Sequence, residues 1–303
     1  MGNWRASGRC QGWSRGSTGA STGRLFVSES FRPSRRLGQN FLIDKSVAMR
    51  IIELAELSPG NSVLEVGPGT GALTDILIAH SSEPRVVAVE IDYRLADALR
   101  DRCSGEARLT VTRADVLRLE PDQLFTGPGP WVVVSNAPYS ISGALLRWLM
   151  AASPKFDRSI IMLQSEVVDR LVARPGTKAY GVLTLATQFY FQIERLLKVS
   201  PRAFRPRPKV GSSVIRLTTR RVPPVPVEDS ELLLKVIRAA FSQRRKTIRN
   251  SLLAGAATLG ATAEGVDRAL GLAEISPKIR AETLSLEKFA ILADSFLVAA
   301  REP

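Results

Sequence analysis

A short turn after an apolar run brings together an amide, a rigid ring and an aromatic side chain. The stretch WVVVSNAPYSIS, residues 131–142, runs from a predicted buried strand into Asn136, Pro138 and Tyr139. The Asn136 side-chain oxygen and a backbone carbonyl in the Ala137–Pro138 step can each accept a hydrogen bond from an amine. Pro138 has a fixed φ and no backbone donor, which keeps the turn rigid, and Tyr139 can stack on a flat ring. Taken alone, the stretch also fits an ordinary Asn-Pro turn that begins a helix.

A glycine-rich loop lies earlier in the chain. The stretch VLEVGPGTGALT has the pattern of a strand, a loop with Gly67, Gly69 and Gly71, and a helix, with the acidic Glu65 near the end of the strand. Glycines allow a tight turn and a close approach of a ligand to the backbone. Dinucleotide-binding loops have the wider spacing G-x-G-x-x-G, which places a pyrophosphate at the helix start. The closer spacing favours a ligand without phosphate, and we expect Glu65 and the three glycines to line its site.

Two further acids end the next two predicted strands. Glu90 ends the run in VAVEID, and Asp115 ends the run in TRADVL. A carboxylate at the first position can accept hydrogen bonds from both ribose hydroxyls and would repel a 2′-phosphate. A carboxylate at the second position can accept from an exocyclic adenine amine. Each acid alone also fits a helix N-cap or a surface charge, but together the three strand ends predict a nucleoside cofactor without phosphates, such as S-adenosylmethionine.

This cofactor beside the Asn136 turn predicts methyl transfer to an adenine amine. The exocyclic nitrogen of adenine shares its lone pair with the ring and is a poor nucleophile. Acceptors at its N–H bonds, from Asn136 and the following backbone, would draw the nitrogen toward tetrahedral geometry while Tyr139 stacks on the base. An arylammonium product is acidic enough to lose its proton to water, so no general base is needed. A base inside a duplex cannot reach such a turn, so the target must be flipped out or unpaired.

The elements that would position these residues alternate along the chain. Helical spacing covers residues 45–57, 72–80 and 93–103, and short apolar runs cover residues 61–67, 85–92, 108–116, 131–136 and 158–164. Strands that alternate with helices predict a parallel sheet covered on both faces, which is an α/β fold of the Rossmann-like kind. Ligands bind beyond the carboxyl ends of such strands, and the motif residues fall there.

A proline-rich stretch divides the chain. Residues 222–229, VPPVPVED, predict a stiff linker. We expect a cofactor-binding domain over residues 31–222 and a small all-helical, RNA-binding domain over residues 223–303. Residues 1–30 are rich in Arg, Ser and Gly without periodicity and are predicted to be a disordered leader. Their composition fits either an organellar transit peptide or an overlong start of a bacterial protein.

Composition excludes several kinds of protein. No run of about eighteen apolar residues is present, so no membrane-spanning helix is expected. The one histidine, His80, excludes chemistry built on several histidines, and Cys10 and Cys103 form no zinc pattern, so no metal site is expected. The net charge is +13, and residues 195–221 and 238–249 contain basic residues without any acid. Such stretches can attract a phosphate backbone, although a solvated surface explains them equally well.

From about Arg35 to the C-terminus the sequence resembles the small-subunit (16S-type) rRNA adenine N6,N6-dimethyltransferases. The segments that carry the resemblance are LGQNFLID (37–44), VLEVGPGTGALT, VAVEID, NAPYSIS, residues 163–191, AFRPRPKVGSSVIRL (203–217) and AFSQRRKTIRNSL (240–252). The resemblance implies a class I S-adenosylmethionine-dependent methyltransferase that dimethylates two adjacent adenines near the 3′ end of that rRNA. It also implies a monomer acting late in biogenesis, on a nearly mature small subunit, in a bacterial cytoplasm or, with a transit peptide, in an organelle.

The resemblance also implies roles for individual residues. Asn136, Pro138 and Tyr139 would be the catalytic residues. Cofactor contacts are implied at Asn40, Leu42, Gly67, Glu90, Asp115 and Asn136. Contacts to ribosomal RNA are implied at Arg205, Arg207, Lys209, Arg244, Arg245, Lys246 and Arg249.

Two departures from the family pattern and two alternative functions remain. The family usually has Leu where Ala137 stands, and it commonly reads NIST where residues 140–143 read SISG. The smaller Ala137 could loosen the turn and slow the second methylation. One alternative is a macrolide-resistance methyltransferase acting on large-subunit rRNA, but the segments PGTKAYG and QRRKTIRNSL argue against it. The other is a non-catalytic assembly or transcription factor, against which stand the intact Glu65, Glu90, Asp115 and Asn136.

Overall fold

The computed structural model describes residues 33–34, 37–127 and 129–301, and the predictions for the leader lie outside these residues. The described residues form two compact units. The first comprises the chain up to Val168 together with Gln192–Thr219, and the second comprises Asp169–Phe191 and the chain from Arg220 onward. This division differs from the predicted boundary at residue 222, because a segment from the middle of the chain packs within the helical unit.

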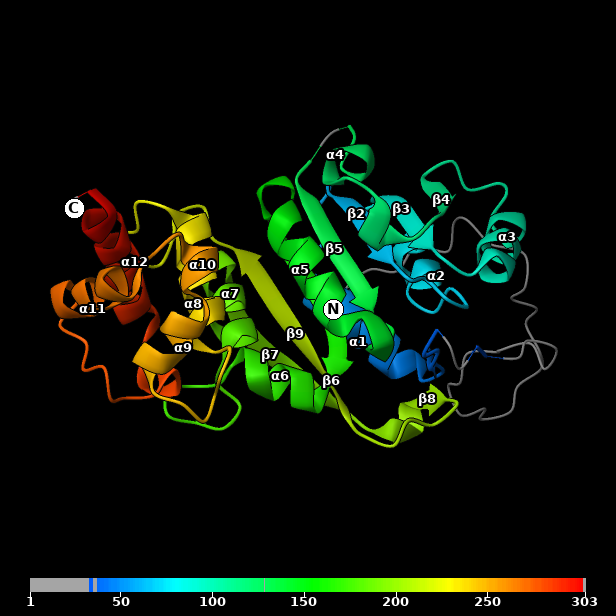
Figure 1. The fold of residues 1–303 in the computed structure, drawn as a ribbon. Helices are drawn as coiled ribbons and strands as arrows, with labels where there is room; N and C mark the ends of the chain where they lie inside the picture. The colour runs from blue at the N-terminus through cyan, green and yellow to red at the C-terminus, as the bar shows by residue number, and fades with distance from the viewer. Residues whose placement is uncertain (1–32, 35–36, 128, 302–303) are drawn as a thin grey trace. The chain divides into compact units, whose positions relative to one another are not determined.

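The first unit is built on a mostly parallel sheet, which confirms the predicted fold class. Its order is β4-β3-β2-β5-β6-β9-β7. The five predicted apolar runs form the parallel strands β2 (Ser62–Val66), β3 (Arg85–Glu90), β4 (Leu109–Arg113), β5 (Trp131–Asn136) and β6 (Arg158–Gln164) (Figure 1). The remaining strands are β7 (Phe191–Val199) and β9 (Ser212–Thr219), and β9 pairs antiparallel with β6. Because β2 and β5 are central, their apolar side chains are buried on both faces.

The three predicted helices of the first unit form as α1 (Lys45–Leu54), α2 (Thr74–Ile78) and α3 (Tyr93–Arg102). Three further helices, which were not predicted, are α4 (Pro121–Leu124), α5 (Ser142–Ala152) and α6 (Ser165–Leu171), and α6 continues into the second unit. Side chains cap two of the predicted helices, since Asp44 accepts from the backbone at the start of α1 and Asp92 does so at the start of α3. These caps fix where the chain enters each helix at the edge of the sheet formed by the carboxyl ends of the parallel strands.

A short segment crosses that same edge. Strand β1 (Phe41–Leu42) pairs antiparallel with β8 (Phe204–Arg205), and the amide of Ile43 donates to the Ala203 carbonyl at 2.8 Å. Residues 37–44, which include the LGQNFLID motif, are called the covering segment below. Long-range pairing therefore holds it in place at its C-terminal end.

The second unit is helical around its own core. It contains α7 (Val182–Tyr190), α8 (Ser230–Ala240), α9 (Ile248–Ala254), α10 (Ala256–Leu259), α11 (Ala263–Leu272) and α12 (Leu286–Arg301). Apolar side chains of five of these helices and the turn after α8 meet there, among them Leu185, Phe241, Leu252, Leu270 and Phe289. No helix in the part of the chain that the structure describes is long and apolar enough to cross a membrane.

The segment before α7 belongs to this helical core. Tyr180 is 2% exposed, and its hydroxyl donates to the Leu284 carbonyl at 2.9 Å. The Gly176 amide donates to the Glu282 carbonyl at 2.7 Å. These contacts between residues about a hundred positions apart explain why the linker at 222–229 does not by itself mark the boundary between the units.

Candidate functional site

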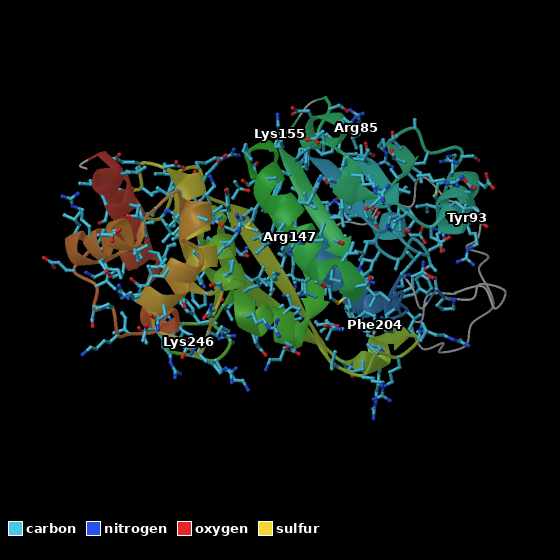
Figure 2. All side chains as sticks on the ribbon, viewed as in Figure 1. Arg85, Tyr93, Arg147, Lys155, Phe204 and Lys246 are labelled. Atoms are coloured by element: carbon cyan, nitrogen blue, oxygen red, sulfur yellow. The ribbon has the colours of Figure 1, made fainter. Side chains whose placement is uncertain are left out.

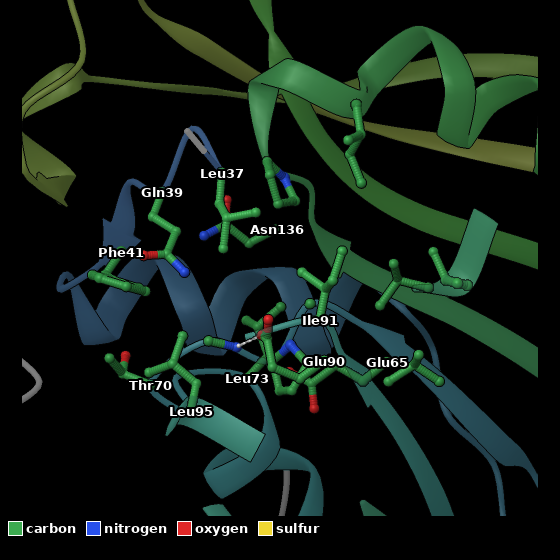
Figure 3. A pocket seen from close by; sticks show the side chains of 18 of the residues that line it. Leu37, Gln39, Phe41, Glu65, Thr70, Leu73, Glu90, Ile91, Leu95 and Asn136 are labelled. Atoms are coloured by element: carbon green, nitrogen blue, oxygen red, sulfur yellow. Dashed lines mark hydrogen bonds between the residues drawn. The ribbon is translucent and has the colours of Figure 1, made fainter. Parts of the chain in front are cut away.

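A cavity of about 240 Å³ lies at the carboxyl ends of β2, β3 and β5. Its wall is formed by the glycine loop after β2, by residues at or just after the ends of β3, β4 and β5, and by part of the covering segment. Figure 3 shows Leu37 and Gln39 across the cavity from Glu90 and Leu95. The predicted residues that line it are Asn40, Leu42, Glu65, Gly67, Gly69, Glu90, Asp115, Asn136 and Pro138. The structure thus brings together residues that are far apart in sequence, as the rule for parallel sheets requires.

The glycine loop approaches its neighbours closely. Gly67 and Gly69 have φ values of +69° and +58°, in the left-handed region that suits glycine. A Cβ at Gly67 would lie 3.6 Å from the Pro138 ring, and a Cβ at Gly69 would lie 3.3 Å from the Phe41 ring. Side chains at these positions would therefore narrow the space between the loop and the facing segments.

Gly71 differs from the other two glycines. Its φ is +87°, but it does not line the cavity. The position of its missing Cβ is filled by the guanidinium of Arg102, which forms an ion pair with Asp75 at 2.8 Å. The structure therefore gives Gly71 a packing role and does not bring it to the cavity with Gly67 and Gly69.

Glu90 fastens the glycine loop to the end of β3. Glu90 is 5% exposed, and its carboxylate accepts from the Gly69 amide at 3.0 Å and from the Asp92 amide at 2.9 Å. Burial raises the pKa of Glu90, and these two backbone hydrogen bonds oppose that rise. A carboxylate has about four lone-pair sites, so acceptor capacity remains for a ligand with two hydroxyls.

Asp115 follows β4 and combines two roles that the sequence left open. It accepts from the Leu117 amide at 3.0 Å, which is the contact of an N-cap, and it also lines the cavity. Arg118 Nε lies 3.7 Å from its second carboxylate oxygen. The carboxylate is therefore held in place by a backbone donor while part of it borders the space for a ligand.

Glu65 is the most deeply buried acid of the site. It is 1% exposed, and the Thr74 hydroxyl donates to it at 2.7 Å. The pKa of Glu65 is raised from 4.5 to about 8, mainly by burial; the Thr74 hydrogen bond opposes this rise, and the nearby Asp75 and Glu90 contribute to it. At neutral pH Glu65 is therefore mostly protonated in the protein without ligand.

Asn136, at the end of β5, is held by the covering segment. Its amide nitrogen donates to the Asn40 carbonyl at 3.4 Å, and the Asn40 side chain donates to the Gly38 carbonyl at 3.2 Å. This arrangement commits the Asn136 nitrogen and leaves the side-chain oxygen as an acceptor at the cavity wall. The buried hydroxyl of Ser135 also donates to the Val66 carbonyl at 2.7 Å, which ties the end of β5 to the end of β2.

The residues after Asn136 form a tight turn. Pro138 lines the cavity and precedes a single 3-10 turn, Tyr139–Ile141. Tyr139 is half-buried and lies outside the cavity wall, with its hydroxyl 2.6 Å from Ser212 Oγ. Ala137 is 2% exposed and does not line the cavity either.

Sequence reasoning missed the contribution of Gln39 and Ile91. Gln39 lines the cavity and donates to Asp92 at 3.0 Å, which links the covering segment to the start of α3. Ile91 lines the cavity yet is 49% exposed, an unusual state for an isoleucine beside a site. The only available signal was their position, since Gln39 lies inside the LGQNFLID motif and Ile91 directly follows Glu90.

The basic residues predicted to face RNA fall into two sets. Arg205, Arg207 and Lys209 of the first unit are exposed, as are Arg245 and Lys246 of the second, and Figure 2 shows Lys246 at the surface. The other two basic residues have partners inside the second unit. Arg244 donates to the carbonyls of residues 178 and 180, and Arg249 forms a two-pronged ion pair with Asp267 at 2.5 and 2.7 Å.

Comparisons with known proteins agree with these motifs. The family described as "Ribosomal RNA adenine dimethylase" matches residues 30–291. A protein of Geobacillus sp. (strain WCH70) named "Ribosomal RNA small subunit methyltransferase A" is 39% identical over 92% of this chain and 96% of its own length. One of the same name from Syntrophotalea carbinolica is 44% identical over 86% of this chain and 96% of its own length.

Two solved structures share the fold. That of the 23S rRNA methyltransferase ErmE is similar with a TM-score of 0.62 and 31% identity, over 85% of this chain and 99% of its own. That of a dimethyladenosine transferase from Plasmodium falciparum has a TM-score of 0.69 and 23% identity, over 86% of this chain and 98% of its own. With the family match over most of its length and relatives of about 40% identity, the chain belongs to the ribosomal RNA adenine dimethylase family.

Proposed function

We propose that this protein dimethylates the N6 amines of two adjacent adenines near the 3′ end of small-subunit rRNA, with S-adenosylmethionine as methyl donor. It acts as a monomer on a nearly mature small subunit, in the cytoplasm of a bacterial cell. The observation that carries this proposal is the fixed amide of Asn136. Its nitrogen is committed to the Asn40 carbonyl, so its oxygen is available at the wall of a cavity whose other polar groups suit a nucleoside.

The cavity residues fit S-adenosylmethionine. Gly67 and Gly69 leave room for a ligand against the backbone, and Glu90 retains acceptor capacity for the two ribose hydroxyls. Asp115 borders the space where an adenine amine would be recognised, and Leu42 and Ile91 supply apolar surface. When bound, this cofactor supplies an electrophilic methyl group attached to a sulfonium.

The chain's own residues would align the target amine. The Asn136 oxygen accepts one N–H of the adenine amine, and a backbone carbonyl of the following turn accepts the other. Both contacts favour a tetrahedral nitrogen whose lone pair is free of the ring. Pro138 keeps the turn rigid, so that little reorganisation is needed when the base arrives.

No basic side chain is needed to remove the proton. His80 lies after α2, its Nδ1 is 2.7 Å from Ser82 Oγ, and it does not line the cavity. The arylammonium that forms on the target nitrogen is acidic and transfers its proton to water. Positioning and charge complementarity are therefore the tasks left to the protein.

A second candidate function is methylation of large-subunit rRNA. Its support is the solved structure of a 23S rRNA methyltransferase, which is 31% identical to this chain. The relatives named for the small subunit are more similar, at 39% and 44% identity. The exposed Arg245 and Lys246 of the second unit belong to the segment QRRKTIRNSL, which argues against a large-subunit enzyme.

Purified, unmodified ribosomal subunits test the choice directly. The protein is incubated with radiolabelled S-adenosylmethionine and either small or large subunits, and the rRNA is digested and analysed by mass spectrometry. We expect dimethyladenosine at two adjacent positions near the 3′ end of the small-subunit rRNA and none in the large subunit. Label that appears only in large-subunit rRNA would support the second candidate, and binding without label would support a non-catalytic factor.

A further inference from the structure

The hydroxyl of Tyr139 is held by a buried serine. Tyr139 Oη lies 2.6 Å from Ser212 Oγ, near the short end of the range for O–H···O hydrogen bonds. Ser212 is 1% exposed. Burial raises the pKa of Tyr139, so the phenol stays neutral and keeps its proton at physiological pH. The contact is thus a hydrogen bond between the neutral hydroxyl of a half-buried tyrosine and that of a buried serine.

The sheet fixes the position of Ser212. It is the first residue of β9 and pairs with Gln164, the last residue of β6. Because β9 runs antiparallel to β6, its beginning lies at the same sheet edge as the end of the parallel strands. The Ser165 amide donates to the Gly211 carbonyl at 3.0 Å, which fixes the chain just before Ser212. The serine is therefore a rigid point at the edge where β5 delivers the Asn136 turn.

The orientation of the Tyr139 ring decides how well it can stack on a base, and a rigid hydrogen-bond partner can fix that orientation. The first side-chain torsion sets where a tyrosine ring lies, and a hydrogen bond at the far oxygen fixes that torsion. The phenolic oxygen lies on the axis of the second torsion, so the hydrogen bond favours one ring plane only because the phenol hydroxyl prefers to lie in the plane of its ring. A base gains full stacking energy only when the two rings lie in a preferred arrangement. We propose that Ser212 is a positioning residue, which holds the Tyr139 ring in the orientation that stacks on the target base. This inference rests on the proposed function.

The second methyl transfer would depend on the Tyr139–Ser212 hydrogen bond more than the first. An unmodified adenine amine has two N–H bonds, and both can be held by the acceptors at the Asn136 turn. A monomethylated amine has one N–H left, so one of these hydrogen bonds is lost. Stacking then carries a larger share of the alignment. Loosening the ring should therefore slow the second transfer more than the first.

Single-turnover methylation of small subunits tests the inference with five variants. Ser212→Ala and Tyr139→Phe each remove the hydrogen bond, and the double variant removes both partners. Ser212→Thr keeps the hydroxyl. Ser213→Ala is the matched control, because Ser213 is equally buried but its hydroxyl lies 3.1 Å from Ser165 Oγ. Mass spectrometry measures monomethyl- and dimethyladenosine separately, and calorimetry measures cofactor binding.

We expect Ser212→Ala to slow the second transfer by roughly 3- to 10-fold, the rate equivalent of one lost hydrogen bond. Monomethyladenosine should accumulate, while cofactor affinity stays unchanged. Tyr139→Phe should give the same result, the double variant should be no worse than either, and Ser212→Thr should restore the rate. Ser213→Ala should behave as the wild type. A 2-aminopurine at the target position should also lose stacking-dependent quenching in Ser212→Ala.

Four outcomes would overturn the inference. Additive effects of the two single changes would show that the serine does not act through Tyr139. Equal slowing of both transfers together with a lower melting temperature would show a structural role alone. If the wild type dimethylates small subunits and Ser212→Ala does so at the same rates, the inference is refuted and the proposed function still holds. A wild type that leaves small subunits unmodified would refute both.

Discussion

Replacing Glu65 with glutamine removes the most deeply buried ionisable group of the candidate site at almost constant shape. The pKa of Glu65 is raised by burial from 4.5 to about 8. The unfolded chain therefore loses this proton near pH 4.5, while the folded protein keeps it until about pH 8. The folded state binds more protons in this window, so the contribution of Glu65 to the stability of the first unit falls as pH rises from 4.5 to about 8.

The size of the change in stability follows from the width of the pH interval between the two pKa values of Glu65. Each pH unit inside it corresponds to about 1.4 kcal/mol, so the full interval amounts to about 5 kcal/mol, an upper limit because a buried site relaxes when it ionises. The glutamine side chain of the variant cannot ionise and can still accept from the Thr74 hydroxyl. We expect the variant and the wild type to be similarly stable at pH 5, and the variant to be more stable by several kcal/mol at pH 9.

Urea unfolding between pH 5 and 9, followed by tryptophan fluorescence, measures this difference. Trp131 and Trp148 are both buried in the first unit, so their emission reports its unfolding. Asp75 has a pKa raised to about 6 and Glu90 a raised pKa, and their own titration is common to the two proteins. Their repulsion of an ionised Glu65 exists only in the wild type and is part of the measured difference. Glu53→Gln on the exposed face of α1 is the control and should show no such trend. A difference between Glu65→Gln and wild type that does not change with pH would refute the reasoning.

The remaining predictions concern the turn, the glycine loop and the basic residues. Asn136→Ala is expected to abolish methyl transfer, measured with radiolabelled cofactor, yet leave small-subunit affinity nearly unchanged in filter binding, because its oxygen meets only the reacting amine. Gly71→Ala is expected to lower the melting temperature, since φ of +87° costs a non-glycine residue about 1–2 kcal/mol and the new methyl would meet Arg102. Replacing Arg245 and Lys246 with alanine is expected to weaken rRNA binding and to reduce the salt slope by about 2, one for each phosphate that is no longer neutralised.

Each of these predictions has a control and a contrary outcome. Arg249→Ala removes one charge, from an arginine already paired with Asp267, so it should change the salt slope by less than half of what the exposed pair does. An equal change would place Arg249 at the RNA. Gly105 has open space around it and no left-handed φ, so Gly105→Ala should leave the melting temperature unchanged. Residual methylation by Asn136→Ala would contradict the role given to its amide.

The parallel sheet and the site residues at its edge could be predicted from local sequence. The run Trp131–Asn136 is apolar until its last two residues, and it forms β5 with those bounds. Glu90 ends β3 as predicted, whereas β4 ends at Arg113 and Asp115 follows it. Both acids still line the cavity, because alternation of strands and helices places such ends at one edge. The points where helices end are harder to predict, since α9 and α10 meet at Gly255 inside the segment that the sequence predicts only to be helical.

Contacts between distant residues could not be predicted in the same way. The link from Asn136 to the Asn40 carbonyl spans 96 positions, and that from Tyr139 to Ser212 spans 73. Neither leaves a periodic trace in the sequence. The pairing of Arg249 with Asp267 across 18 positions is similar, since a basic run looks the same whether its charges face solvent or a carboxylate inside the unit. Local patterns specify elements, and packing decides which polar groups meet.

The covering segment has a kinetic consequence for a reaction that places two methyl groups on one amine. Spent donor must leave and fresh donor must enter between the two transfers. Beside the short β1–β8 ladder, the segment is fastened by a few single hydrogen bonds, from Gln39 to Asp92, from Ser140 to the Leu37 carbonyl and from Asn136 to the Asn40 carbonyl. Phe41 and Leu42 are buried and stay with the ladder, but lifting residues 37–40 breaks few hydrogen bonds. Donor exchange can therefore outpace departure of a much larger RNA substrate, and both methyl groups can be added in a single encounter.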